Sequence, residues 1–201
     1  GYEGAQYFTW TAPDGDDPEV GMWGSTSSGV FRLKQPSTGK YILWDGKNIV
    51  MSTTDDKSKS FPVTDKGNFT IRAEFEKGVC TMVKVSGSGK SLTFSNGKVS
   101  VNGQEMQSSI TLNGQQLNMK QGNNYVYEGV LNLKEGQTIS APFSLASFKG
   151  STDLFDGVGN ETWTLKTASD KYYIRLDLFN GEFYACPLSA YPQFIYLDGW
   201  S

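Results

Sequence analysis

The sequence predicts an all-β protein made of two tandem Ig-like or starch-binding-type β-sandwich modules. Short runs alternate apolar and polar residues, which is the period of a half-buried strand. Gly-containing turns, chiefly Asn-Gly and Asp-Gly, separate these runs, and the 201 residues include 23 glycines. A hairpin-like stretch at 71–82 returns about a hundred residues later, at 174–185, which indicates duplication of one small β domain.

The expected strands follow one another along the chain at short spacing. No long stretch shows helical periodicity. The strands are expected at 30–34, 40–44, 68–75, 91–95, 98–103, 109–114, 125–133, 161–166, 172–179, 182–188 and 194–200. Many short strands joined by Gly-rich turns are typical of an all-β sandwich.

The repeated hairpin shows the alternation most clearly. In its first copy the apolar residues of one strand face are Phe69, Ile71, Ala73 and Phe75. In its second copy the corresponding residues are Tyr172, Ile174, Leu176 and Leu178. Each copy then reaches a turn that contains Gly78 or Gly181 and resumes with β-branched or aromatic residues, which predicts a hairpin in each.

The two modules are expected at 1–86 and 91–201. The segment Ser-Gly-Ser-Gly-Lys at 86–90 is the expected linker, because Ser and Gly make a flexible joint that buries nothing. Residues 191–201, which have a proline near their start, fit either a last strand or the opening of a further module.

The composition excludes several classes of function. Histidine is absent, which removes the commonest general base, the usual metal ligand and every Ser-His or Cys-His nucleophile. A net charge of −3 without a basic run is unsuited to nucleic acid. No apolar run approaches the roughly 18 residues that span a bilayer. We therefore expect no metal, no cofactor and no nucleic-acid partner, and we expect Cys80 and Cys186 to be free thiols.

Aromatic residues beside polar turns suggest a glycan-binding site. Trp44 precedes an Asp-Gly turn that carries Lys47 and Asn48, and Phe155 precedes a second such turn. A sugar presents an apolar C–H face to an aromatic ring and hydroxyls to polar side chains, and loops on a rigid sandwich commonly carry binding sites. The alternative is that each ring is the core residue at a strand end.

Four other rings are open to the same two interpretations. Trp23 lies among Gly and Ser, Trp163 follows a polar loop but begins an alternating run, and Tyr125 and Tyr127 share one strand face. The expected ligand-binding residues are Trp23, Trp44, Lys47, Asn48, Tyr125, Tyr127, Phe155, Asn160, Glu161 and Trp163.

Two longer stretches resemble a known family. The stretch NMKQGNNYVYEGVLNLKEGQTISAPFSL is similar to the part of SusE/SusF-type outer-membrane starch-binding lipoproteins in which a strand leads to a Leu-x-x-Gly turn. The stretch TLKTASDKYYIRLDLFNGEFYAC is similar to the closing hairpin of that family, with its Tyr-Ile-Arg-x-Asp-like strand.

The resemblance implies tandem β-sandwich modules at a bacterial cell surface. They would be held at the outer membrane by an N-terminal lipid that is absent from this chain. They would bind polysaccharide or oligosaccharide without cleaving it, alongside other outer-membrane glycan-uptake proteins.

Two other functions stay open on the sequence. The first is a structural or adhesive Ig-like spacer with no ligand of its own. The second is a glycoside hydrolase, which needs two carboxylates facing each other across a cleft. Asp156, Glu161 and Asp177 lie near the candidate loop, but their spacing does not pair them, so no catalytic residue is expected.

Overall fold

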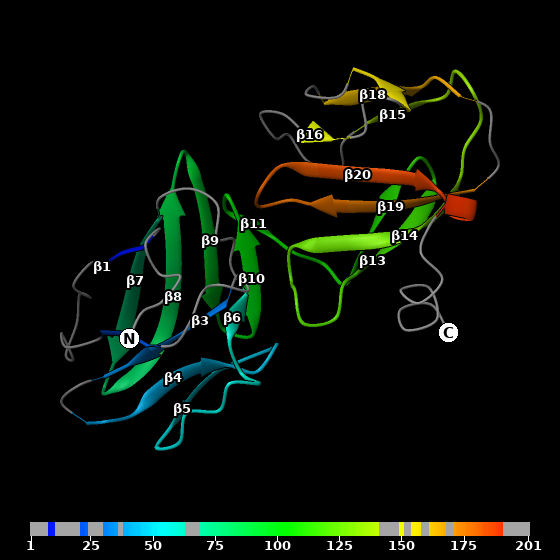
Figure 1. Ribbon diagram of the computed structural model, residues 1–201. Helices are drawn as coiled ribbons and strands as arrows, with labels where there is room; N and C mark the ends of the chain where they lie inside the picture. The colour runs from blue at the N-terminus through cyan, green and yellow to red at the C-terminus, as the bar shows by residue number, and fades with distance from the viewer. Residues whose placement is uncertain are drawn as a thin grey trace. The chain divides into compact units, whose positions relative to one another are not determined.

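The fold is all-β, as the sequence predicts. The computed structural model describes residues 8–10, 21–23, 30–35, 38–62, 69–140, 149–150, 154–157, 161–167 and 171–190 (Figure 1). These residues form four sheets of mostly antiparallel strands. Their one helical element is a 3₁₀ turn, Leu188–Ala190, and no α-helix occurs among them.

The chain divides into two compact units. Unit 1 consists of residues 1–106 together with 121–124, and unit 2 consists of residues 107–120 together with 125–201. The division therefore does not fall at the expected linker. Residues 86–90 instead join β8 (Val79–Gly87) to β9 (Lys90–Ser95), which pair antiparallel up to Gly87 and Lys90.

The linker prediction is wrong because a Ser-Gly pair also suits a tight turn. Ser88 and Gly89 both have positive φ, at 53° and 74°. A two-residue loop with positive φ at both positions is a type I′ turn, whose twist matches that of the flanking strands. Val85 and Leu92, which pair across this hairpin, are fully buried. The segment is thus held in a sheet on both sides.

Unit 1 contains two sheets. The first has the order β1-β7-β8-β9-β10-β11, and the second has the order β2-β3-β4-β5 with β6 paired to β3. Besides β8 and β9, the strands are β1 (Phe8–Trp10), β2 (Gly21–Trp23), β3 (Val30–Lys34), β4 (Tyr41–Trp44), β5 (Ile49–Ser52), β6 (Phe61–Pro62), β7 (Phe69–Glu76), β10 (Lys98–Val101) and β11 (Gln104–Glu105).

An aromatic cluster fills the space between the two sheets of unit 1. The ring of Phe94, on β9, lies 5.0 Å from that of Trp44 and 5.1 Å from that of Phe61, both at steep angles. Phe61 also stacks on Phe31 at 5.0 Å. All four rings are buried, so the apolar faces of the two sheets form one core.

Unit 2 also contains two sheets. The larger has the order β12-β13-β14-β19-β20-β16, and the smaller has the order β15-β18-β17. The strands are β12 (Ser109–Leu112), β13 (Gln115–Met119), β14 (Val126–Asn132), β15 (Thr138–Ser140), β16 (Lys149–Gly150), β17 (Phe155–Asp156), β18 (Thr162–Leu165), β19 (Lys171–Asp177) and β20 (Glu182–Pro187).

Rings from both sheets meet in the core of unit 2. Trp163 of β18 stacks on Phe183 of β20, with ring centroids 4.2 Å apart and an interplanar angle of 12°. Phe155 of β17 meets Phe183 edge-on at 5.2 Å and Tyr172 of β19 at 6.3 Å. Each of these side chains is at most 2% exposed, so the smaller sheet covers the apolar face of the larger one.

Both predicted hairpins are present, but their surroundings differ. β7 pairs with β8, and β19 pairs with β20. The other neighbour of β7 is the parallel strand β1, whereas the other neighbour of β19 is the antiparallel strand β14. The likeness between the two sequences therefore covers the hairpin and does not extend to the order of the sheets.

Gly157 is a position where the fold requires glycine. Its φ is +85°, and a Cβ there would lie 2.7 Å from the backbone oxygen of Thr162. Gly136 has a similar φ of +79°, with nothing within 4 Å of the position that an added Cβ would take.

We expect Gly136→Ala to lower the free energy of unfolding by about 1–2 kcal/mol for its left-handed conformation alone. Gly157→Ala should cost clearly more, because the backbone at Thr162 must also move.

Thermal unfolding of the two glycine variants measures this difference, since both positions lie in unit 2. A lower midpoint for Gly157→Ala than for Gly136→Ala is the expected result. Equal midpoints would show that the close approach at Thr162 carries no cost.

Candidate functional site

The aromatic residues expected to bind a ligand are buried wherever their side chains are described. The exposed fraction is 2% for Trp44 and Tyr125, 1% for Phe155, and 0% for Tyr127 and Trp163. The prediction that these rings form an exposed platform is therefore wrong. Each of these rings lies on a strand or next to one, and other residues of the protein cover it.

Trp44 is held inside unit 1 by its ring and by its indole nitrogen. Its ring packs against Phe94 and, at 6.1 Å, against Phe61. Its indole Nε1 donates a hydrogen bond to Oδ1 of Asn124 at 3.2 Å. Asn124 in turn donates from Nδ2 to the carbonyl oxygen of Gly46 at 3.3 Å. With its polar atom satisfied and its ring covered, Trp44 is a core residue.

The loop after Trp44 is exposed but carries no ring. The Asp45 carboxylate accepts hydrogen bonds from the backbone N–H groups of Asn48 and Lys47, at 2.6 and 2.8 Å. The bond from Asn48 is the main cause that lowers the pKa of Asp45. Lys47 and Asn48 are exposed on a turn that this carboxylate shapes. They could offer polar contacts only.

The tyrosines at 125 and 127 face the core. Tyr127 pairs across the sheet with Leu176 and donates its hydroxyl to the carbonyl oxygen of Gln107. Burial raises the pKa of Tyr127 to about 12. Tyr125 packs on Phe179 with ring centroids 5.5 Å apart. Val126 lies on the other face of the strand and is also buried, so neither face is exposed at this stretch.

Three further candidate residues remain. Glu161 is exposed at the start of the turn before β18. Asn160 and the side chain of Trp23 lie outside the described residues. Among the side chains that are described, none of the expected rings meets its expected polar neighbours at a surface.

A different group of residues lines up across the larger sheet of unit 2. Strand register places Asn118 opposite Glu128, Glu128 opposite Arg175, and Arg175 opposite Tyr184. Residues directly opposite each other in neighbouring strands project from the same face of a sheet. The row runs over β13, β14, β19 and β20, on the face away from the Trp163 cluster, and we refer to these four residues as the outer row.

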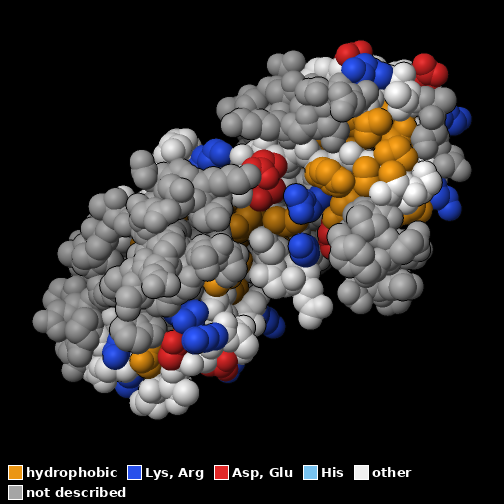
Figure 2. Space-filling model, in the orientation of Figure 1, with side chains coloured by type: hydrophobic (Ala, Val, Ile, Leu, Met, Phe, Trp, Pro, Cys, Tyr) orange, Lys and Arg blue, Asp and Glu red, His pale blue; other side chains and the backbone are white. Residues whose placement is uncertain are grey.

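The outer row contains an exposed ring. Tyr184 is 43% exposed, and the other large apolar side chain exposed among the described residues is Val79, in unit 1. The Arg175 guanidinium lies over the Tyr184 ring at 5.7 Å, which is within the range of a cation–π interaction. In the view of Figure 2, apolar side chains reach the surface of unit 2 with basic side chains beside them.

Polar contacts hold the neighbours of that ring in place. Tyr173, which packs edge-on against Tyr184 at 6.0 Å, donates its hydroxyl to Oε2 of Glu128 at 2.7 Å. Gln116 donates from Nε2 to Oδ1 of Asn118 at 2.7 Å. The outer row therefore presents a ring, a guanidinium, a carboxylate and an amide whose positions are largely fixed.

The turn that joins β19 to β20 is held by the carboxylate of Asp177, which is half-buried. Asp177 accepts hydrogen bonds from the backbone N–H groups of Phe179 and Asn180, at 3.1 and 2.8 Å. It also accepts one from Nδ2 of Asn180 at 2.7 Å. Burial is the main cause that raises the pKa of Asp177. These bonds shape the four-residue turn that sets Arg175 opposite Tyr184.

The repeated hairpin of unit 1 lacks a ring at the matching place. Arg72 corresponds to Arg175, but register places it opposite Lys84, which is followed across the sheet by Thr93 and Ser100. The Nε atom of Arg72 lies 3.3 Å from a carboxylate oxygen of Glu74. The outward face of this hairpin is polar, so it provides a matched comparison for the outer row.

Several chemistries find no support in the described part of the chain. It contains no group of three His, Cys, Asp or Glu residues that could hold a metal ion, and no helix long and apolar enough to cross a membrane. Both cysteines are free, with Cys80 buried and Cys186 half-buried. Comparison with protein-family models, with curated proteins and with solved structures finds no match to this chain.

Proposed function

We propose that this chain binds polysaccharide without cleaving it, and that the outer row of unit 2 is the binding surface. One observation carries the proposal: an exposed ring, Tyr184, stands in register with Arg175, Glu128 and Asn118. Sugar recognition needs an apolar ring face with donors and acceptors around it, and this row supplies all three.

The dimensions of the row suit a short stretch of a glycan chain. Neighbouring strands lie about 4.8 Å apart, so a row over four strands is about 14 Å long. One sugar would stack on Tyr184, and hydroxyl groups further along would meet the guanidinium of Arg175 and the carboxylate of Glu128. A ring contact is worth about 1 kcal/mol by analogy with aromatic pairs. One ring and a few hydrogen bonds then give a Kd of roughly millimolar order.

The existing contacts within the row favour binding. The Tyr173 hydroxyl fixes Glu128, and the Tyr184 ring lies beneath Arg175, before any ligand arrives. Side chains that are already ordered lose little rotamer freedom on binding. Weak binding at one such face is useful where many copies face one polymer, since tethered sites act at a high effective concentration.

The wider setting of this function is part of the same proposal. The two units would be tandem Ig-like or starch-binding-type modules of a surface lipoprotein in the outer membrane. The partners would be polysaccharide and other outer-membrane glycan-uptake proteins. The similarity of 118–145 and 164–186 to the SusE/SusF type supports this setting.

A spacer without a ligand is the second candidate. The burial of the expected rings favours the spacer, because a ring that is packed in a core cannot contact a ligand. These rings are Trp44, Tyr125, Tyr127, Phe155 and Trp163. In that case Tyr184 would be an ordinary surface residue, and the two units would hold another domain at a distance.

Tyr184→Ala separates the two candidates. We expect the variant to bind its glycan about five- to tenfold more weakly, since it loses a contact of about 1 kcal/mol or slightly more. Affinity electrophoresis through gels containing plant, host and microbial polysaccharides measures the loss as reduced retardation. Tyr184→Phe should keep most of the binding, because the ring face remains.

The hairpin of unit 1 supplies the control. Lys84→Ala changes the matching position opposite Arg72, and we expect no change in retardation. Equal weakening by Tyr184→Ala and Lys84→Ala would overturn the outer row as the site. Retardation of the wild-type protein by no polysaccharide would favour the spacer, and release of new reducing ends would show a hydrolase.

A further inference from the structure

We propose that the Asn113–Gly114 turn is a modification site, where the asparagine loses its amide nitrogen to give isoaspartate or aspartate. We further infer that it reacts faster than the other Asn-Gly pairs, which lie at Asn96, Asn102 and Asn180. Asparagine is among the residues that change chemically on prolonged heating. The reaction at this turn is independent of glycan binding.

The reaction needs only the chain and water. The backbone nitrogen of Gly114 attacks the side-chain carbonyl carbon of Asn113, and the new N–C bond closes a cyclic imide. The bond from that carbon to the side-chain nitrogen breaks, and ammonia leaves with the proton of the glycine N–H. Water then opens the imide at either carbonyl. The product is isoaspartate or aspartate, and no oxidant or reductant takes part.

The Asn113–Gly114 turn leaves this attack open. It is the two-residue loop between β12 and β13, where Leu112 pairs with Gln115. Asn113 is exposed, and no hydrogen bond to another described residue holds its side chain. The space beside Gly114 is empty, with nothing within 4 Å of where a Cβ would stand. The asparagine side chain and the glycine nitrogen are therefore free to rearrange.

Asn102 has the same turn geometry but a restrained side chain. Asn102 and Asn113 have φ of 50° and 53°, and each is followed by a glycine with positive φ. The Oδ1 atom of Asn102, however, accepts a hydrogen bond from the backbone N–H of Ser91 at 2.9 Å. The backbone N–H of Asn102 also donates to the oxygen of Ser91 at 2.9 Å. The side-chain bond must break before the amide carbon can meet the nitrogen of Gly103.

The remaining two pairs are also hindered. Asn180 is half-buried, and both its backbone N–H and its side-chain amide donate to the Asp177 carboxylate. At the Asn96 turn, the point where a Cβ of Gly97 would stand lies 3.3 Å from Oδ1 of Asn48 and 3.5 Å from the Lys47 oxygen. In the Asn113–Gly114 pair, by contrast, the asparagine side chain makes no hydrogen bond to a described residue, and no atom crowds the glycine.

The turns at Asn102 and Asn113, which have the same geometry, can be compared in one peptide. Trypsin cuts after Lys98 and Lys120, so residues 99–120 carry both Asn102 and Asn113. We incubate the native protein at mildly alkaline pH and locate the acid by fragment-ion mass spectrometry. Asn102 must first lose a side-chain hydrogen bond of typical strength. We therefore expect Asn113 to convert on the order of fivefold faster than Asn102. The same incubation in denaturant should bring the two rates together.

Two results would overturn the proposal. One is conversion of Asn102 at least as fast as Asn113 in the native protein. The other is no conversion at Asn113 over a time in which the denatured chain reacts. Asn113→Gln provides a second measurement, because its longer side chain closes the ring poorly. Ammonia release from this native variant should fall well below that of the wild type, and unchanged release would count against the assignment.

Discussion

Asp55→Ala is expected to lower the free energy of unfolding of unit 1 by about 3–5 kcal/mol. The substitution leaves the guanidinium of Arg32 without its carboxylate, and Arg32 is only 5% exposed. In the native protein Nε of Arg32 lies 2.6 Å from Oδ1 of Asp55, and Nη2 lies 3.2 Å from Oδ2. A third donor, Nη1, reaches the Ser60 hydroxyl at 3.3 Å.

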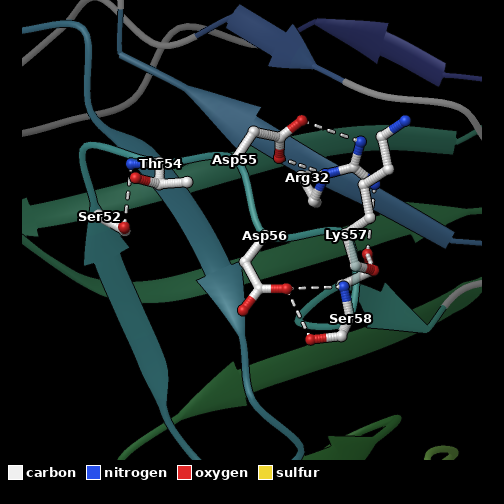
Figure 3. Close-up of polar contacts among 8 residues, drawn as sticks. Arg32, Ser52, Thr54, Asp55, Asp56, Lys57 and Ser58 are labelled. Atoms are coloured by element: carbon white, nitrogen blue, oxygen red, sulfur yellow. Dashed lines mark hydrogen bonds and ion pairs between the residues drawn. The ribbon is translucent and has the colours of Figure 1, made fainter.

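The adjacent carboxylate is a matched control for Asp55. Asp56 points away from Arg32 and accepts hydrogen bonds from the backbone and hydroxyl of Ser58 (Figure 3). It also lies 3.6 Å from the ammonium of Lys59, and both side chains are more than two-fifths exposed. Solvent screens this pair, so Asp56→Ala should cost far less than Asp55→Ala.

Urea unfolding of the wild type and both variants tests this expectation. A double variant, Arg32→Met with Asp55→Leu, should recover much of the lost stability, because no buried charge then lacks a partner. Equal losses for Asp55→Ala and Asp56→Ala would show that burial of Arg32 does not set the cost.

Trp163→Ala is expected to cost about 3–5 kcal/mol in unit 2. The indole is fully buried and stacks on Phe183 at 4.2 Å, and Phe183 also meets Phe155. Truncation would leave a cavity between β18 and β20 that the surrounding rings cannot fill without moving. We therefore expect Trp163→Ala to lower the unfolding midpoint, because it removes a core contact and not a contact with ligand.

Trp163→Phe and Tyr184→Ala are the controls for that experiment. The phenylalanine keeps a ring against Phe183 and should recover part of the stability. Tyr184 lies on the face of the larger sheet opposite to that of Phe183, so its loss should barely move the midpoint while it weakens glycan binding. If the Trp163→Ala protein kept its stability but no longer bound glycan, the prediction that Trp163 is an exposed binding residue would be right after all.

The sequence was sufficient where local chemistry decides the outcome. Along β7, from Phe69 to Glu76, buried residues alternate with half-buried or exposed ones as the pattern predicts. The Asn-Gly pairs at 96, 102 and 113 all form two-residue hairpin loops. Turn type follows from the residues that tolerate positive φ, and alternation follows from the pleat of the strand.

The segment 86–90 marks the limit of such local signals. Ser and Gly suit both a flexible joint and a tight turn, and the two differ only in whether the flanking strands pair. Val85 and Leu92 pair across the turn and are both fully buried, which favours the hairpin. The boundary between the units depends on which strands share a sheet, and no short stretch of sequence contains that information.

The sequence by itself determined the all-β class, the repeated hairpin and most of the turns. The tertiary structure decided which rings are covered, because an alternating strand has two faces and only a second sheet makes one of them a core. Trp163 and Tyr184 both alternate cleanly, yet one is fully buried and the other is 43% exposed. Register also placed Tyr184 beside Arg175. The length of the turn between two strands sets that pairing, and composition does not.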